Sequence, residues 1–115
     1  ITFSAEPGVR ITARNATTPD GINLEGADYV TVEGFTVNGM PRTGIRTVLN
    51  TGVVIRNNSC DLNEKWGILT GFSENLTIQG NVTSRSAQQH GIYVSNSADN
   101  PVIRGNTSWG NRQCG

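Results

Sequence analysis

The feature that most constrains the fold of this chain is an internal repeat of about 23 residues. A Gly-Ile pair recurs at steps of 23, 23 and 24 residues and begins at Gly21, Gly44, Gly67 and Gly91. A second marker, a short aliphatic segment with alternating side chains, recurs at nearly the same step and ends at Glu33, Arg56, Gln79 and Arg104. Because two markers keep one period, the sequence predicts a stack of similar units rather than a set of unrelated strands.

The pattern inside each unit is that of short β-strands. Around both markers, apolar side chains recur at every second residue, as in a strand whose successive side chains point to opposite faces, whereas a helix would show a period of about 3.6 residues. A unit of this length fits one coil of a β-solenoid, in which each strand pairs with its copy about 4.8 Å above. We therefore predict an all-β fold, a right-handed parallel β-helix of about four to five coils, uncapped or truncated. The isoleucines of the first marker should lie inside it, namely Ile22, Ile45, Ile68 and Ile92.

Polar residues also recur in columns. Asn58, Asn81 and Asn106 fall at one position of the turn that follows the second marker. Stacked asparagines can form hydrogen bonds up and down such a column, so we expect an asparagine ladder. Glu33 lies one coil below Arg56, which predicts an exposed ion pair of small energetic value.

Residues 1–115 are expected to form a single β-helix domain, as a fragment of a longer solenoid. An uncapped stack leaves apolar layers and strand edges open, so we expect a homo-oligomer that forms through open ends or edges. Nine basic residues balance nine acidic ones, and no apolar run approaches the roughly 18 residues of a membrane span. We therefore expect neither nucleic acid nor a membrane as a partner.

The two cysteines are predicted to remain unbridged. Cys60 falls in an inward-facing column with Val37 and Thr83, and Cys114 falls two coils higher in the column of Trp66. Two coils correspond to about 9–10 Å of rise, whereas a disulfide needs Cα atoms within about 7 Å of each other. Cys60 should therefore be a buried apolar residue and Cys114 a free thiol.

Two stretches carry a resemblance to a known group of proteins, and they read His90-Gly-Ile-Tyr-Val-Ser-Asn and Val102-Ile-Arg-Gly-Asn-Thr-Ser. They resemble right-handed parallel β-helix repeat proteins of the pectate-lyase-like superfamily, of the carbohydrate-binding and sugar-hydrolase type, over roughly Gly8 to the end. The resemblance implies a secreted or periplasmic location and a polysaccharide ligand in a groove along one parallel sheet. It does not fix an activity, because one fold hosts many functions.

The residues that related enzymes use for catalysis are replaced here. In the mannuronan epimerases and alginate lyases that the pattern resembles, an aromatic-Gly-aliphatic start is followed by an Asp-Pro-His core. Leu69 and Gly71 stand at the Asp and His positions, and Gln89 stands at a position that is basic in those enzymes. No acid/base pair for abstracting a sugar C5 proton is evident, so we predict no catalytic residue and favour a non-enzymatic role for the isolated chain, with an enzyme as the alternative.

No cofactor or metal site is predicted either. His90, the only histidine, has no carboxylate in sequence register to orient it. Asp28, Glu74 and Asp99 share one corner column, where calcium is the functional interpretation and tight-turn chemistry is the structural one. We favour turn chemistry for this column.

The outer face of the sheet that contains the Gly-Ile marker is the best candidate for a ligand site. Residues from neighbouring coils are predicted to bind substrate there, namely Arg46, Trp66, Leu69, His90 and Tyr93. Aromatic faces can stack on sugar rings, and Arg and His can bond hydroxyl groups. The structural alternative is that the exposed rings simply stack on one another.

Three functions remain open from the sequence. The leading one is a non-catalytic β-helix module that binds polysaccharide on the Gly-Ile face. The second is a polysaccharide lyase, hydrolase or epimerase that acts on sugars containing uronic acids, and a charged residue in reach of His90 would favour it. The third is a structural, self-assembling solenoid, which burial of this face by another chain would favour.

Overall fold

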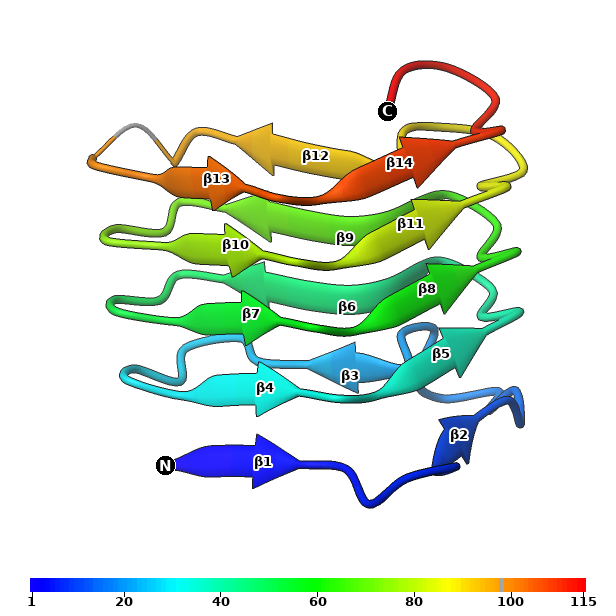
Figure 1. Cartoon of the computed structure of the whole chain (residues 1–115), viewed down its shortest axis with the longest axis horizontal. Coiled ribbons are helices and arrows are strands. Elements are labelled where there is room, and N and C mark those ends of the chain that lie inside the picture. The colour runs from blue at the N-terminus through cyan, green and yellow to red at the C-terminus, as the bar shows by residue number, and fades with distance from the viewer. Residues whose placement is uncertain (98) are drawn as a thin grey trace.

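A computed structural model, which describes residues 1–97 and 99–115, shows the predicted right-handed parallel β-helix (Figure 1). Three parallel sheets run the length of the stack, and each coil gives one strand to each sheet. Within the described residues the sheets hold five, five and four strands, so four coils are complete and a fifth has two strands. The predicted fold class is confirmed.

The sequence repeat corresponds to one coil. The second marker forms the first sheet, which consists of β1 (Thr2–Ser4), β4 (Thr31–Glu33), β7 (Val54–Arg56), β10 (Thr77–Gln79) and β13 (Val102–Arg104). The second sheet consists of β2 (Arg10–Ile11), β5 (Thr36–Asn38), β8 (Ser59–Asp61), β11 (Val82–Ser84) and β14 (Thr107–Trp109). The Gly-Ile marker opens the third sheet, which consists of β3 (Ile22–Asn23), β6 (Thr43–Val48), β9 (Trp66–Gly71) and β12 (Ile92–Ser95).

Aliphatic columns fill the interior, as the alternation predicted. In the third sheet, Ile45 pairs in register with Ile22 below it and with Ile68 above it. Ile45 and Ile68 are fully buried, whereas Ile22 and Ile92 are half-buried because they lie in the outer coils of the stack. Burying one such side chain contributes about 1.5–3 kcal/mol, so the central coils hold most of the hydrophobic stabilisation.

The predicted asparagine ladder closes the turn between the first and second sheets. The side-chain oxygen of Asn81 accepts hydrogen bonds from the backbone N–H and the side-chain amide of Asn58, at 3.0 and 3.1 Å. The Asn81 amide in turn donates to the carbonyl of Ile55 at 2.9 Å and to the side-chain oxygen of Asn106 at 3.0 Å. The ladder thus satisfies buried backbone groups that the turn leaves without strand partners.

Ion pairs connect neighbouring coils on the outside. Glu33 and Arg56 form the predicted pair, at 2.6 Å, and Asp61 pairs with Arg85 in the same manner. Hydrogen bonds from these arginines lower the pKa of Glu33 and of Asp61 from their usual values. Because the pairs lie at the surface, where water and salt screen them, we expect each to contribute little to stability.

The cysteines are unbridged, as predicted. Cys60 is buried and pairs in register with Val37 and Thr83, whereas Cys114 is exposed. Burial raises the pKa of the Cys60 thiol to about 12. The thiolate is the reactive form of cysteine, so the two thiols should differ widely in reactivity.

We therefore expect one thiol per chain to react with iodoacetamide under native conditions at pH 8. Peptide mass spectrometry should locate the label on Cys114, and Cys60 should react only after denaturation. A Cys114→Ser variant should stay unlabelled until it unfolds. Equal native labelling of both cysteines would contradict the inward position of Cys60.

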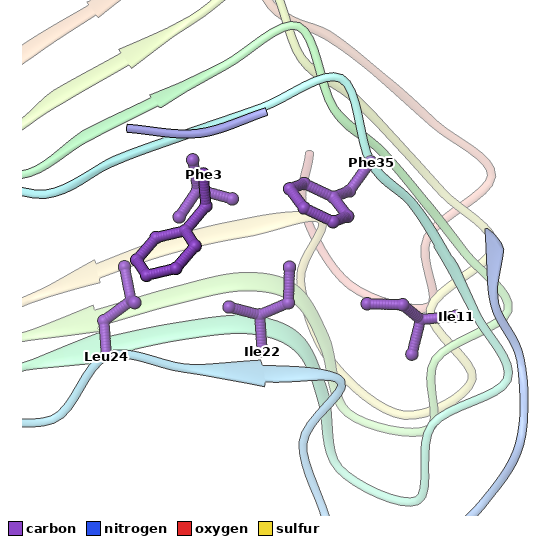
Figure 2. A pocket seen from close by; sticks show the side chains of 6 residues that line it. Phe3, Ile11, Ile22, Leu24 and Phe35 are labelled. Carbon is purple, nitrogen blue, oxygen red and sulfur yellow. The ribbon is translucent and has the colours of Figure 1, made fainter. Parts of the chain in front are cut away.

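A cavity of about 220 Å³ lies in the first coils (Figure 2). Only apolar side chains line it, namely Phe3, Ile11, Ile22, Leu24, Val32 and Phe35. Ligand sites usually add a few polar groups that fix the orientation of the ligand, and this cavity offers none. Self-association through such apolar layers stays a prediction.

Among the residues described, no helix has the length and apolar character that a membrane crossing requires.

Candidate aromatic binding site

In two neighbouring coils, the residue before the Gly-Ile pair of the third sheet carries a half-buried ring, whereas Thr43 at the equivalent position is fully buried. A Cβ on Gly67 would point at the side chain of Thr83, and the next residue, Ile68, is fully buried. Because both residues of this Gly-Ile pair face inward, Trp66 before them is turned outward. This local distortion positions Trp66 at the start of β9 and His90 just before β12, one coil above.

Three rings come together on this outer surface. The ring centroids of Trp66 and Tyr93 are 6.3 Å apart, with an angle of 14° between the ring planes. Those of His90 and Tyr93 are 5.1 Å apart, with an angle of 10°. We call these three residues the aromatic cluster. The rings stack on one another, as the structural alternative predicted, yet 40% of Tyr93 remains exposed. Mutual stacking therefore orders the rings and leaves Tyr93 exposed, whereas Trp66 and His90 are half-buried.

His90 is oriented by the backbone rather than by a carboxylate. Its Nδ1 accepts a hydrogen bond from the backbone N–H of Cys114, at 3.2 Å. An accepting Nδ1 carries no proton, so the neutral imidazole has its proton on Nε2. His90 can therefore donate one hydrogen bond from Nε2 to a ligand oxygen.

Lys65 belongs to this site and was missed by the sequence analysis. Its ammonium group lies 5.7 Å from the centroid of the Trp66 ring, within the range of a cation–π interaction. It is the only lysine of the chain. Its position beside Trp66, in the turn before a Gly-Ile pair, is the signal that could have identified it.

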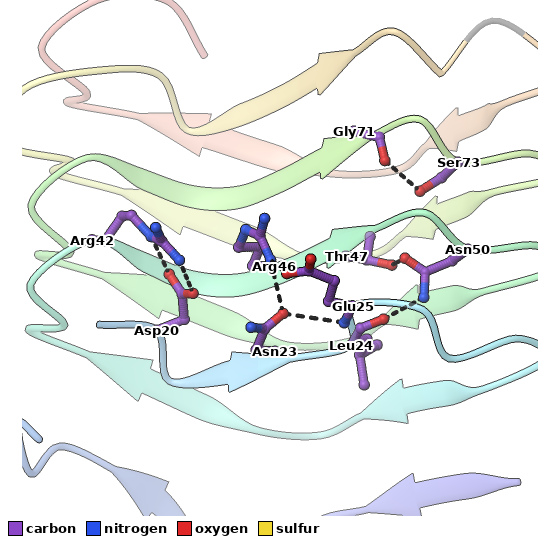
Figure 3. Close-up of polar contacts among 10 residues, drawn as sticks. All are labelled: Asp20, Asn23, Leu24, Glu25, Arg42, Arg46, Thr47, Asn50, Gly71 and Ser73. Carbon is purple, nitrogen blue, oxygen red and sulfur yellow. Dashed lines mark hydrogen bonds and ion pairs between the residues drawn. The ribbon is translucent and has the colours of Figure 1, made fainter. Parts of the chain in front are cut away.

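The remaining two predicted site residues, Arg46 and Leu69, lie in the same column as Tyr93 but differ in how accessible they are to a ligand. Arg46, Leu69 and Tyr93 follow one another in register on β6, β9 and β12. Leu69 is half-buried between its neighbours. Figure 3 shows Arg46 directed toward Asn23 and Glu25 of the coil below, and it forms an ion pair with Glu25. Its guanidinium is thus engaged within the protein.

The opposite end of the third sheet is a closed polar turn. Figure 3 shows Asn50 bridging the hydroxyl of Thr47 and the backbone of Leu24. In the acidic corner column, the carboxylate of Asp28 accepts a hydrogen bond from the backbone N–H of Thr51 at 2.8 Å. This bond joins Asp28 to the coil above, whereas the expected turn chemistry would bond the carboxylate within its own turn. The described residues contain no group of three or more His, Cys, Asp or Glu side chains that could hold a metal ion.

Comparison with known proteins gives a family for this chain. Residues 1–115 match the family described as NosD, periplasmic copper-binding protein. No curated protein and no solved structure matches the chain. The match agrees with the observed parallel β-helix and with the secreted or periplasmic location that was expected. Because it covers the whole chain, the protein belongs to the NosD family of periplasmic copper-binding proteins.

Proposed function

We propose that this NosD-family chain is a non-catalytic β-helix module that binds a polysaccharide at the aromatic cluster. The observation that supports the proposal is the outward position of Trp66, His90 and Tyr93 on two consecutive coils. Rings that are already ordered lose little conformational entropy on binding, which favours contact with the apolar faces of sugar rings. The Nε2–H group of His90 and the Tyr93 hydroxyl can add hydrogen bonds to sugar hydroxyls.

The surroundings of His90 favour binding over catalysis. General acid–base chemistry needs a titratable side chain that a second group holds in position for proton transfer. In the described part of the chain, the hydrogen bond to His90 comes from a backbone amide and no carboxylate bonds the ring. The aromatic cluster therefore has hydrogen-bonding capacity but lacks a paired acid and base.

The name of the family raises copper as a ligand, and the side chains of this chain do not fit it. Copper prefers thiolate, thioether and imidazole donors. Met40 and Cys60 are buried in the core, and the raised pKa of Cys60, about 12, keeps it protonated. Cys114 and His90 remain as accessible donors, without a third His, Cys, Asp or Glu beside them among the described residues. We assign no copper site to these coils.

The proposal can be tested with Trp66 as the reporter. The chain has two tryptophans, and the other, Trp109, lies in β14 with Arg85 over its ring. In a Trp109→Phe background, Trp66 fluorescence should change on titration with a binding polysaccharide from a panel of cellulose, dextran, alginate and polygalacturonate. Adding Tyr93→Ala should weaken binding at least tenfold, about 1.4 kcal/mol. Tyr29→Ala, which removes a tyrosine that is 71% exposed in a distant turn, should leave it unchanged.

Two results would contradict the proposal. One is the absence of binding across the panel, and the other is equal binding by the Tyr93→Ala and Tyr29→Ala variants. A product assay on the same polymers tests the enzyme alternative. Unsaturated sugar products that disappear in a His90→Ala variant would replace the binding module with a polysaccharide lyase.

A further inference from the structure

We infer that the polymer bound at the aromatic cluster is an anionic polysaccharide, with Lys65 and Arg112 as its charge partners. The inference rests on the proposed function and adds the chemical class of the ligand. It comes from the distribution of paired and unpaired charges around the third sheet, which the balanced net charge of the whole chain conceals.

The carboxylates that could neutralise the cluster are already paired with arginines. Around the third sheet, three ion pairs join Arg14 to Glu64, Arg42 to Asp20 and Arg46 to Glu25. Lys65 and Arg112 take part in none of the ion pairs found among the described residues, which are Arg14–Glu64, Arg42–Asp20, Arg46–Glu25, Arg56–Glu33 and Arg85–Asp61. Lys65 instead lies over the face of Trp66. The start of the third sheet therefore carries positive charge that is not compensated.

Two acidic residues that form no ion pair among the described residues lie at the other end of the same sheet. Glu74 follows the end of β9 and bridges to Thr51 in the turn toward the first sheet, and Asp28 occupies the same turn one coil below Thr51. Because β9 spans six residues, this acidic corner is about 20 Å from Trp66. The two ends of the sheet thus have opposite charge, and the aromatic cluster lies at the positive end.

The backbones of the two cationic residues lie at levels below and above His90 and Tyr93 along the axis of the stack, and both side chains are exposed. The backbone N–H of Lys65 donates to the carbonyl of Arg42 in the coil below, and the backbone N–H of Gln113 donates to the carbonyl of Gln89. These residues share one corner of the stack, where Gln113 lies two coils above Lys65. Arg112 precedes Gln113, so its level is about 10 Å above that of Lys65. His90 and Tyr93 lie on the coil between these levels. A polymer that follows the axis would meet a cation, the rings and a second cation in turn.

The test compares charged polymers with neutral polymers of the same backbone. Polygalacturonate should bind at least tenfold more tightly than its fully methyl-esterified form at 20 mM NaCl, and the advantage should shrink at 0.5 M NaCl because salt screens exposed charges. Dextran sulfate and dextran form a second pair, which shows whether sulfate can replace carboxylate. Lys65→Gln and Arg112→Gln should each weaken binding of the charged polymers about threefold to tenfold and leave the neutral ones unchanged.

Arg10→Gln provides the matched control, because Arg10 lies in β2 on the second sheet and forms no ion pair among the described residues. It removes one charge far from the cluster and should leave binding unchanged. Equal binding of charged and neutral polymers would overturn the inference while the aromatic site stands. An Arg10→Gln effect as large as that of Lys65→Gln would also overturn it, since the attraction would then be non-specific. If none of the polymers binds, the proposed function fails and the inference fails with it.

Discussion

Replacing Asn81 by alanine is expected to lower the free energy of unfolding by about 3–5 kcal/mol. Asn81 is fully buried at the centre of the asparagine ladder. Its removal leaves the backbone N–H of Asn58 and the carbonyl of Ile55 without the partners that they have at 3.0 and 2.9 Å. Each buried polar group without a partner costs about 1–3 kcal/mol, and the lost packing adds to this cost.

Urea denaturation followed by circular dichroism would measure the change. Asn106→Ala should have a smaller effect, because Asn106 is only partly buried and ends the ladder. Asn15→Ala is the matched control, since its side chain is exposed and bonds only to Thr17 in its own loop. A loss below about 1 kcal/mol for Asn81→Ala would mean that water or a relaxed backbone satisfies these groups.

The fold could be predicted because a solenoid converts sequence separation into spatial neighbours. Once the period is known, residues one period apart must pair, as Ile45 does with Ile68 and Val32 with Ile55. The same reasoning placed Asn58 below Asn81. The sequence does not determine whether a coil has two or three strands, because strands as short as β2 give too few residues for alternation to be seen.

The site was less predictable because it depends on side-chain direction as well as on register. The period placed Trp66, His90 and Tyr93 on neighbouring coils, and the structure brings their rings together. The period could not show that Glu25 forms an ion pair with Arg46, because the two residues belong to columns at different positions in the coil. Lys65 was missed because its contact with the adjacent Trp66 depends on the direction of its side chain, which the register does not give.

The glycine of the Gly-Ile marker leads to the second prediction of large effect. Gly67→Ala is expected to destabilise the protein by about 3 kcal/mol or more. A Cβ at this position would lie 2.7 Å from the carbonyl oxygen of Gly91 and 2.9 Å from the side chain of Thr83. The Gly91 carbonyl accepts the hydrogen bond of Ile68 at 2.9 Å, so it cannot move away without weakening the pairing of β9 with β12.

Gly71→Ala is the matched control for this substitution, because it adds the same methyl group to the other end of β9. Its Cβ would lie 3.5 Å from the Val48 side chain, an ordinary van der Waals contact. We expect this variant to stay within about 1 kcal/mol of the parent. Trp66 precedes Gly67, so its fluorescence in the Trp109→Phe background reports whether β9 is displaced. Equal stability of the two alanine variants would show that the coils separate easily at this point, and the glycine would then need another explanation than close packing of successive coils.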